Sequence, residues 1–281
     1  MTTSTARVFV IGAGKAGRAL AHAMQIGGID VVGLHGRRPA EGSTWGEWPE
    51  SLGRATVVLV TVRDAELEGV LRDLLTAGLA EGAVVLHASG TAEPPTLDLL
   101  RTQGHSGGTF HPLLPLTDPT RAAEQLHRAW IGIDGDARAR SVSRKLAAAI
   151  GARVVEIPDG AKARYHAAAV LVSNFPIVLF ALATRVLRSA GVSEEAASGV
   201  AGTLLTAAVE NARAVAPSAA LTGPVARGDV ETVRAHLAAL AEMRDVLEVY
   251  RVLSLEAIPL AEEAGTERGR LEELRRLLGE S

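Results

Sequence analysis

The chain has 281 residues and a formal net charge of −3, with 47% hydrophobic and 22% charged residues. This length allows one large domain or two ordinary ones, and the composition is that of a globular protein. The nearly balanced charge argues against nucleic acid or an anionic membrane as a partner. Because there is no cysteine, a disulfide scaffold, a thiol nucleophile and a cysteine zinc site are excluded, and a reducing cytoplasmic location is expected.

The first half of the sequence alternates between strand and helix patterns. Short apolar or β-branched runs predict strands at residues 7–11, 31–34, 55–62, 83–87, 108–111, 130–133 and 153–157. Helical spacing predicts helices at residues 15–26, 67–75, 96–101 and 137–150. Strands that alternate with helices predict an α/β fold with a doubly wound, mostly parallel sheet.

The pattern changes at Pro158, after which almost every segment has helical spacing. We predict helices at residues 159–190, 193–216, 230–241, 245–264 and 268–278. The expected organisation is therefore an α/β domain over residues 1–157 and an all-α C-terminal domain over residues 158–281.

An uncharged apolar run covers residues 167–184. Its length reaches that of a membrane span. However, Ser173, Asn174 and Pro176 interrupt its middle and no other segment resembles it, so we expect a buried core helix and no membrane. A helix that is apolar on nearly every face needs cover all round. A domain of this size could provide that cover alone, but a second copy of the chain makes it easier, so we expect a homodimer formed mainly through the helical domain.

A glycine-rich turn stands between the first strand and the first helix. It consists of Gly12, Ala13, Gly14, Lys15, Ala16 and Gly17. In the pattern Gly-x-Gly-x-x-Gly, the first glycine permits a tight turn, the second lets the backbone approach a pyrophosphate, and the third lets the helix pack on the strand. The helix N-terminus then offers free N–H groups to the phosphates. The turn therefore predicts a dinucleotide-binding Rossmann domain.

The end of the second strand indicates which dinucleotide is bound. Sites that prefer NAD place an acidic residue about 20 residues after the glycines, where it bonds the ribose 2′-OH. Arg37 and Arg38 stand there instead, and planar guanidinium groups suit a 2′-phosphate. We predict an NADP(H) site, which Thr61 and Val62 complete at the end of the third strand.

Polar residues also follow the next strands. In open α/β sheets the ligand lies beyond the carboxyl ends of the strands. Ser89 and Gly90 follow the fourth strand and His111 ends the fifth, so we expect them to contact a carboxylate or carbonyl group of a small-molecule substrate. His87 is more consistent with a structural residue that points back into its strand. No cluster has the spacing of metal ligands, and no metal is expected.

The first helix of the second domain carries a polar stripe. Lys162, His166 and Ser173 share one face of this otherwise apolar helix. Unpaired polar groups are costly to bury, so a substrate pocket would explain the stripe. We predict that Lys162 and His166 are catalytic and that Ser173 and the adjacent Asn174 bind substrate. The alternative is that Lys162 and His166 lie in exposed first turns.

The loop at residues 222–229 is consistent with either a structural or a binding role. Its glycines and proline fix a turn, and Asp229 is placed to cap the helix that begins at Val230. Arg227 could bind an anionic substrate or a cofactor phosphate. A structural turn with a solvated arginine fits equally well.

Together these residues resemble the superfamily of β-hydroxyacid dehydrogenases, 6-phosphogluconate dehydrogenase and ketopantoate reductase. The resemblance implies a Rossmann domain, a helical domain that often dimerises, and Lys162 as the catalytic lysine. Tyr165 and His166 stand where that superfamily has asparagine. Nearly the whole chain also resembles a Rossmann-like family with a C-terminal domain of unknown function. The segments that carry this resemblance are residues 87–90, 110–112, 162–166, 173–174 and 221–229. Some of its members look like ketopantoate reductases.

Three functions remain open at this point. The first is NADPH-dependent reduction of a carbonyl compound such as a 2-oxoacid, with Lys162 as the general acid. The second is imine reduction in the manner of pyrroline-5-carboxylate reductase, which has no need of the lysine. The third is a non-catalytic protein that binds NADP(H).

Overall fold

The computed structural model describes residues 6–93 and 95–279. Their contacts divide the chain into two compact units, Met1–Ser173 and Asn174–Ser281. Each unit is described by itself below.

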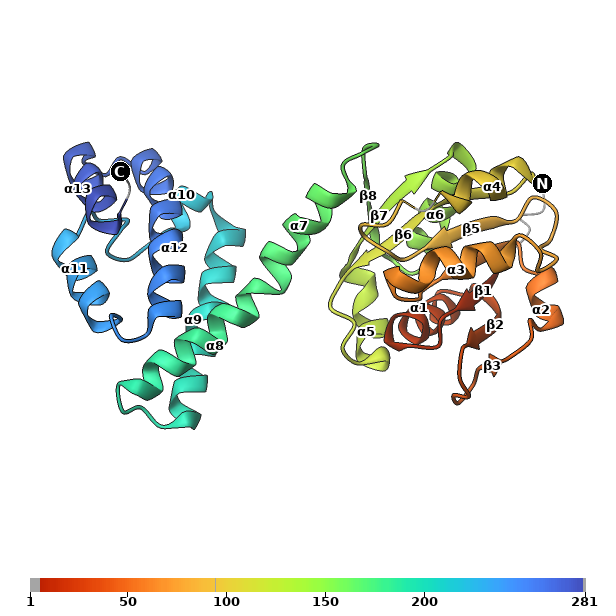
Figure 1. Cartoon of the computed structure of the whole chain (residues 1–281), viewed down its shortest axis with the longest axis horizontal. Coiled ribbons are helices and arrows are strands. Elements are labelled where there is room, and N and C mark those ends of the chain that lie inside the picture. Colours follow the sequence, from red (N-terminus) through yellow and green to blue (C-terminus); the bar gives the residue numbers. More distant parts are fainter. Residues whose placement is uncertain (1–5, 94, 280–281) are drawn as a thin grey trace. The chain divides into compact units, whose positions relative to one another are not determined.

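The first unit is built on one eight-stranded sheet (Figure 1). The strands are β1 (Arg7–Ile11), β2 (Asp30–Gly36), β3 (Thr44–Trp45), β4 (Val57–Val60), β5 (Val84–His87), β6 (Ser106–Leu113), β7 (Trp130–Gly135) and β8 (Arg153–Glu156). Their order in space is β3-β2-β1-β4-β5-β6-β7-β8. Neighbours run parallel except β6 and β7, which are antiparallel. The predicted doubly wound, mostly parallel α/β fold is confirmed.

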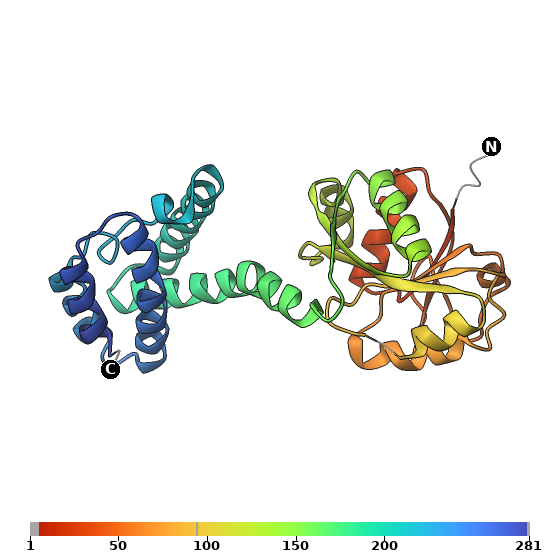
Figure 2. The same ribbon diagram turned by 90° about the horizontal axis from the view of Figure 1, so that it is seen from above.

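Helices cover both faces of the sheet (Figures 1 and 2). One face carries α1 (Lys15–Ile26), α5 (Pro119–Gln125), the short 3₁₀ turn η1 (Leu126–Arg128) and α6 (Ala137–Ala149). The other carries α2 (Glu50–Gly53), α3 (Asp64–Leu74) and α4 (Thr96–Thr102). Val10 packs under the first set and its neighbour Ile11 under the second. The central strand β4 is apolar and buried at every position because side chains alternate between two covered faces.

This layering brings the candidate residues to one edge of the sheet. The strands β1, β4 and β5 end there, each followed by a loop with predicted site residues. The strand β6 pairs with β5 only as far as Thr109 and continues to Leu113, so His111 stands beyond the end of β5. Parallel strand ends therefore gather residues that are far apart in the sequence.

The second unit is helical. It contains α8 (Phe175–Ser189), α9 (Glu194–Ala214), α10 (Pro217–Ala220), α11 (Val230–Ala239), α12 (Arg244–Glu263) and α13 (Arg268–Leu278). Val233, Ile258 and Leu271 from α11, α12 and α13 are completely buried in its core. The carboxylate of Asp229 accepts a hydrogen bond from the backbone N–H of Thr232 at 3.1 Å, which confirms the predicted cap of α11.

The long helix expected over residues 159–190 begins later and has a break. It consists of α7 (Lys162–Ser173), which belongs to the first unit, and α8, with Asn174 between them. Pro176 explains the break, because proline cannot donate a backbone hydrogen bond and its ring crowds the preceding turn. The contacts therefore place the division between units at Ser173 and not at residue 157, where the sequence pattern changes.

The expectation that this helix is buried is wrong for the single chain. The segment Lys162–Ser189 is long and apolar enough to cross a membrane by length and composition, and none of its most apolar window is buried. Val172 is 78% exposed and Ile177 67%. One such helix is weak evidence for a membrane span, since core helices have the same composition. A helix that is apolar on every face needs neighbours on all sides, and the described residues do not bury this one.

Candidate functional site

The glycine-rich turn makes different demands on its three glycines. Gly12 has a φ of 110°, and a Cβ there would lie 2.6 Å from Oγ1 of Thr61. A Cβ on Gly17 would lie 1.8 Å from the carbonyl oxygen of Gly12. Gly14 has an ordinary φ of −79° and open space where its Cβ would be. The fold therefore requires Gly12 and Gly17, whereas neither backbone nor packing requires a glycine at Gly14.

A cavity of about 370 Å³ opens at this turn. Of the predicted cofactor residues, its lining includes Gly12, Ala13, Gly14, Arg37, Arg38, Thr61 and Val62. Lys15 and Ala16 form the first turn of α1 beside it. Thr61 donates a hydrogen bond to the carbonyl oxygen of Gly12 at 3.0 Å and so holds the turn in place.

Arg63 and Glu66 are charged residues of this cavity that the sequence analysis missed. Glu66 in α3 accepts hydrogen bonds from Arg37 at 2.7 Å and from Arg63 at 2.5 Å. The hydrogen bond from Arg63 holds the pKa of Glu66 below its ordinary value. Arg63 follows β4 in the same segment as Thr61 and Val62, which was a usable signal. Glu66 could not be placed from the sequence, because only the fold brings α3 to the end of β2.

The loop after β5 meets two histidines. Ser89 is buried, and its hydroxyl accepts a hydrogen bond from the backbone N–H of Ala92 at 2.9 Å, which shapes the loop. A Cβ on Gly90 would lie 2.5 Å from Nδ1 of His166 and 2.9 Å from Nε2 of His111. The fold therefore brings four predicted site residues from three segments into one cluster: Ser89, Gly90, His111 and His166.

Both histidines of this cluster are unusual. Burial lowers the pKa of His111 to about 4, helped by the neighbouring His166, so the ring of His111 is neutral at physiological pH. The rings of His111 and His166 lie 5.6 Å apart between centroids. Nδ1 of His166 is buried without a hydrogen-bond partner among the described residues. An unpaired buried nitrogen is expensive in a structural role, which favours a functional one.

His87 lies inside its strand, as the sequence suggested, and its structural role stays a prediction because its Nδ1, like that of His166, is buried without a hydrogen-bond partner among the described residues. It is completely buried in β5, and its Nε2 lies 3.2 Å from the hydroxyl of Thr109 on the neighbouring strand. Burial lowers its pKa to about 3, so the ring stays neutral.

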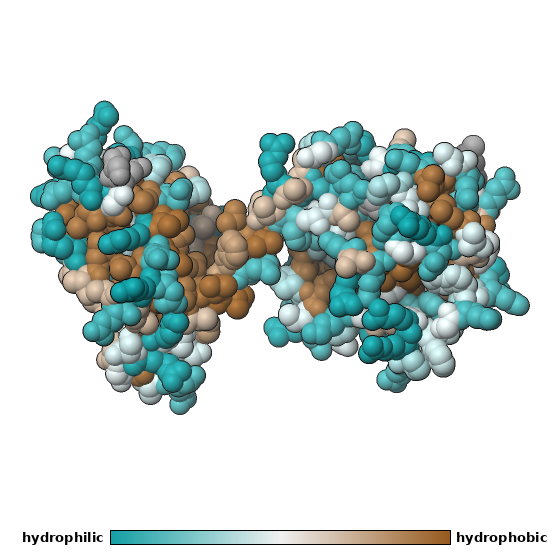
Figure 3. All heavy atoms as spheres, in the orientation of Figure 1, coloured by the Kyte–Doolittle hydropathy of each residue, from teal (hydrophilic) through white to brown (hydrophobic). Residues whose placement is uncertain are grey.

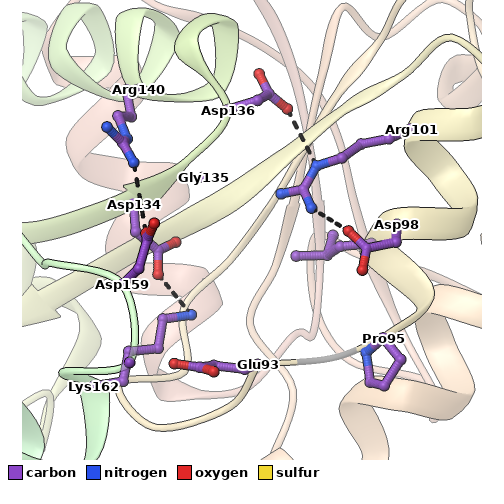
Figure 4. A pocket seen from close by; sticks show the side chains of 12 residues that line it. Glu93, Pro95, Asp98, Arg101, Asp134, Gly135, Asp136, Arg140, Asp159 and Lys162 are labelled. Atoms are coloured by element: carbon purple, nitrogen blue, oxygen red, sulfur yellow. Dashed lines mark hydrogen bonds and ion pairs between the residues drawn. The ribbon is translucent and has the colours of Figure 1, made fainter.

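Lys162 is buried in the first turn of α7, so the alternative of an exposed lysine is wrong. Its ammonium lies 2.8 Å from a carboxylate oxygen of Asp134 in β7 and donates to the carbonyl oxygen of Ala92, also at 2.8 Å. It borders a polar pocket of about 650 Å³ that also contains Arg101 and Arg140, each paired with an aspartate (Figure 4). Lys162 therefore ties α7 to β7 and to the loop that carries Gly90. Its role as a general acid stays a prediction.

The remaining predicted residues lie elsewhere. Ser173 ends α7 and is partly exposed, Asn174 is exposed in the break before α8, and Arg227 is exposed in the loop before α11. Their contacts with substrate stay predictions. Residues 6–93 and 95–279 contain no group of three or more histidine or acidic side chains placed to hold a metal ion.

Comparison with known proteins agrees with this architecture. A model of a family described as "Domain of unknown function (DUF2520)" matches residues 129–257. No curated protein matches the sequence significantly.

Three solved structures share the fold at low sequence identity. A candidate NADP oxidoreductase from Bacteroides fragilis is 20% identical, with a TM-score of 0.72 over 91% of this chain and 98% of that one. A Thermotoga maritima protein is 23% identical, with a TM-score of 0.69 over the same shares of the two chains. A Plasmodium falciparum pyrroline carboxylate reductase with NADP bound is 11% identical, with a TM-score of 0.59 over 98% of each chain. This level of identity establishes the fold, and the superfamily suggested by the sequence is not confirmed.

Proposed function

We propose that this chain is an NADP(H)-dependent oxidoreductase that reduces a small carboxylate-bearing carbonyl compound, with ketopantoate as the first 2-oxoacid to test. Gly14 carries the proposal. Its backbone and its surroundings both tolerate a side chain, yet the position is glycine and faces a cavity at a helix N-terminus. Close approach of a pyrophosphate supplies the missing reason for this glycine.

The arginines of the same cavity support NADP(H) over NAD(H). Arg37, Arg38 and Arg63 border one cavity and can surround the 2′-phosphate. We expect NADPH to bind at least ~10-fold more tightly than NADH, because each charge-assisted hydrogen bond contributes roughly 1.5–3 kcal/mol. The double variant Arg37→Ser/Arg38→Ser should lose most of this preference in fluorescence titrations.

Arg72→Ser is the matched control, because this exposed arginine pairs with Glu68 on α3 outside the cavity. It should leave both affinities unchanged. Equal affinities of the unaltered protein for NADPH and NADH would contradict the assignment of the arginines.

Carbonyl reduction needs a hydride and a proton. A bound reduced nicotinamide would supply the hydride, so the protein must supply the proton. Two groups are candidates: Lys162, as the resemblance implies, and the neutral His111 beside Gly90. Two of the three N–H groups of the Lys162 ammonium already face acceptors, the carboxylate of Asp134 and the carbonyl oxygen of Ala92. One N–H group is left for a substrate.

Imine reduction is the second candidate function, and the surroundings of Lys162 favour it. An iminium substrate already has its proton, so it needs only the hydride. The ion pair with Asp134 explains why the chain has a buried lysine without giving that lysine a catalytic role. The presence of Lys162 therefore no longer argues against an imine substrate.

A panel of 2-oxoacids and cyclic imines, scored by the loss of NADPH absorbance, separates these functions. Turnover of ketopantoate or a related 2-oxoacid supports the first proposal, and turnover of 1-pyrroline-5-carboxylate alone supports the second. NADPH binding without turnover of any member would identify a non-catalytic NADP(H)-binding protein.

The helical unit supports a proposal about assembly. Hydrophobic side chains gather on its visible face (Figure 3), and an apolar groove of about 650 Å³ is lined by residues of α8, α9, α11 and α12. Leu204 in this groove is 66% exposed. Because monomeric proteins rarely expose large apolar patches, a second copy of the chain is the proposed cover.

Light scattering should give twice the chain mass of 29.2 kDa at micromolar concentration. Leu204→Glu should shift the protein toward monomers, since burying an unpaired charge at an interface is unfavourable. Ile26→Glu is the control, because Ile26 is equally exposed, at 65%, on α1 of the other unit. A monomer in the unaltered protein would rule out the dimer.

A further inference from the structure

The ring of His111 has Gly90 next to its Nε2 side and Tyr165 next to its Nδ1 side. The hydroxyl of Tyr165 is 2.9 Å from Nδ1 of His111, and the two rings meet edge to face. The hydroxyl lies directly over Gly132, the residue that faces His111 across β6 and β7. A Cβ on Gly132 would come within 2.1 Å of it. A glycine at this strand position therefore makes room for the hydroxyl of Tyr165.

The hydrogen bond has a preferred direction. Within the described part of the chain, Nδ1 of His111 is the one hydrogen-bond partner of this hydroxyl. Burial raises the pKa of Tyr165, so the phenol keeps its proton at neutral pH. A neutral imidazole offers one acceptor nitrogen, and the phenol O–H is the better donor of the pair. With the hydroxyl as the donor to Nδ1, the proton of the His111 ring is on Nε2, which faces Gly90.

We propose that Tyr165 is a positioning residue that acts through His111: it fixes the tautomer with a proton on Nε2 and gives its own proton to Nδ1 as the Nε2 proton passes to substrate. The proposal rests on the proposed reductase function. It also names the substrate group, which is an uncharged carbonyl oxygen held by Nε2–H beside Gly90. A ring that stays neutral cannot act as a cationic acid, so a donor behind it is needed.

The proton balance is complete. As the carbonyl carbon accepts a hydride, the electron pair of the C=O bond moves to oxygen, and that oxygen takes the proton from Nε2 of His111. Nδ1 takes the proton of Tyr165 as Nε2 releases its own. After the product leaves, Nε2 takes a proton from solvent and Nδ1 returns its proton to the Tyr165 oxygen. The net result is one proton taken from solvent for each hydride transferred, with His111 and Tyr165 restored.

The chain offers a matched control for this pair. Tyr250 in α12 has its hydroxyl 2.9 Å from Nδ1 of His236, with the rings also edge to face. This second pair lies in the helical unit and outside the cluster at Gly90. Tyr165→Phe and Tyr250→Phe thus remove the same hydrogen bond from two places, and only the first removal should affect the reaction.

The first test uses ¹⁵N NMR of protein with labelled histidine, in which the signals of His111 are identified by their loss in His111→Asn. We expect the Nε2–H tautomer in the unaltered protein and a mixture of tautomers in Tyr165→Phe. The pKa of His111 should rise in this variant, because the lost hydrogen bond favours the neutral ring. The charged or titratable groups that act on His111 are Asp64, His87, Lys162, Tyr165 and His166. A proton on Nδ1 in the unaltered protein, or an unchanged tautomer in the variant, overturns the proposal.

The second test compares turnover of two probes, ketopantoate and 1-pyrroline-5-carboxylate, with NADPH. Tyr165→Phe should lower kcat for the carbonyl probe by about 10²-fold, the low end for a lost general acid, and leave the imine probe within about 3-fold. Tyr250→Phe should change neither. Equal losses for both probes would identify a merely structural tyrosine. If the unaltered protein does not bind NADPH, the proposed function fails, whereas the NMR result still decides the role of Tyr165.

Discussion

Lys162→Ala should lower the free energy of unfolding by about 3–5 kcal/mol, the usual result of removing one partner of a buried ion pair. The side chains of Lys162 and Asp134 are only 5% and 17% exposed, so the aspartate left behind would be an unpaired charge in a poorly hydrated place. The same variant should lower kcat by about 10²-fold, because an unpaired Asp134 carboxylate next to the first turn of α7 displaces the helix that carries Tyr165 and His166. Urea unfolding and steady-state kinetics measure the two effects.

The double variant Lys162→Met/Asp134→Leu separates structure from chemistry. Replacing a buried ion pair by apolar side chains is often neutral for stability, so we expect the unfolding free energy to recover. We also expect kcat to recover to within about tenfold, because the proton route through His111 stays intact. If stability recovers while kcat stays 10²–10⁴-fold lower, Lys162 is the general acid. Lys145→Ala, on the exposed side of α6, is the control and should have no effect.

Gly14→Ala should weaken NADPH binding by roughly 10²-fold and leave the thermal stability unchanged. The φ of −79° suits alanine, and nothing lies within 4 Å of the added Cβ, so the free protein has no reason to change. The Cβ would instead occupy the space into which a pyrophosphate must come to reach the N-terminus of α1. Fluorescence titration with NADPH and thermal unfolding measure the two properties.

Gly69→Ala provides the comparison for this variant. Gly69 lies inside α3 with open space at its Cβ position, far in sequence from the glycine-rich turn. Alanine in a helix is more stable than glycine by roughly 0.5–1 kcal/mol, so this variant should be slightly stabilised and bind NADPH normally. Unchanged NADPH affinity in Gly14→Ala would remove the main support for dinucleotide binding.

Much of the fold follows from local sequence patterns. Apolar runs predict the strands β1, β4 and β5, because both faces of these strands are covered. The glycines between β1 and α1 predict the turn, because it is tight. The cap at Asp229 was equally readable, since its hydrogen bond to Thr232 spans only three residues. The break at Asn174 was not foreseen, although Pro176 was visible in the sequence.

The sequence by itself determined the α/β fold, the glycine-rich turn, the absence of an acidic residue at the end of β2, and the choice of most residues proposed for the candidate site. These depend on backbone geometry and on the period of apolar side chains, which are local properties. Only the tertiary structure decided that Lys162 is paired with Asp134, that Glu66 holds Arg37, and that Tyr165 stands behind His111 over Gly132. These contacts join strands and helices up to tens of residues apart, and no local pattern encodes which side chain will face another across a sheet.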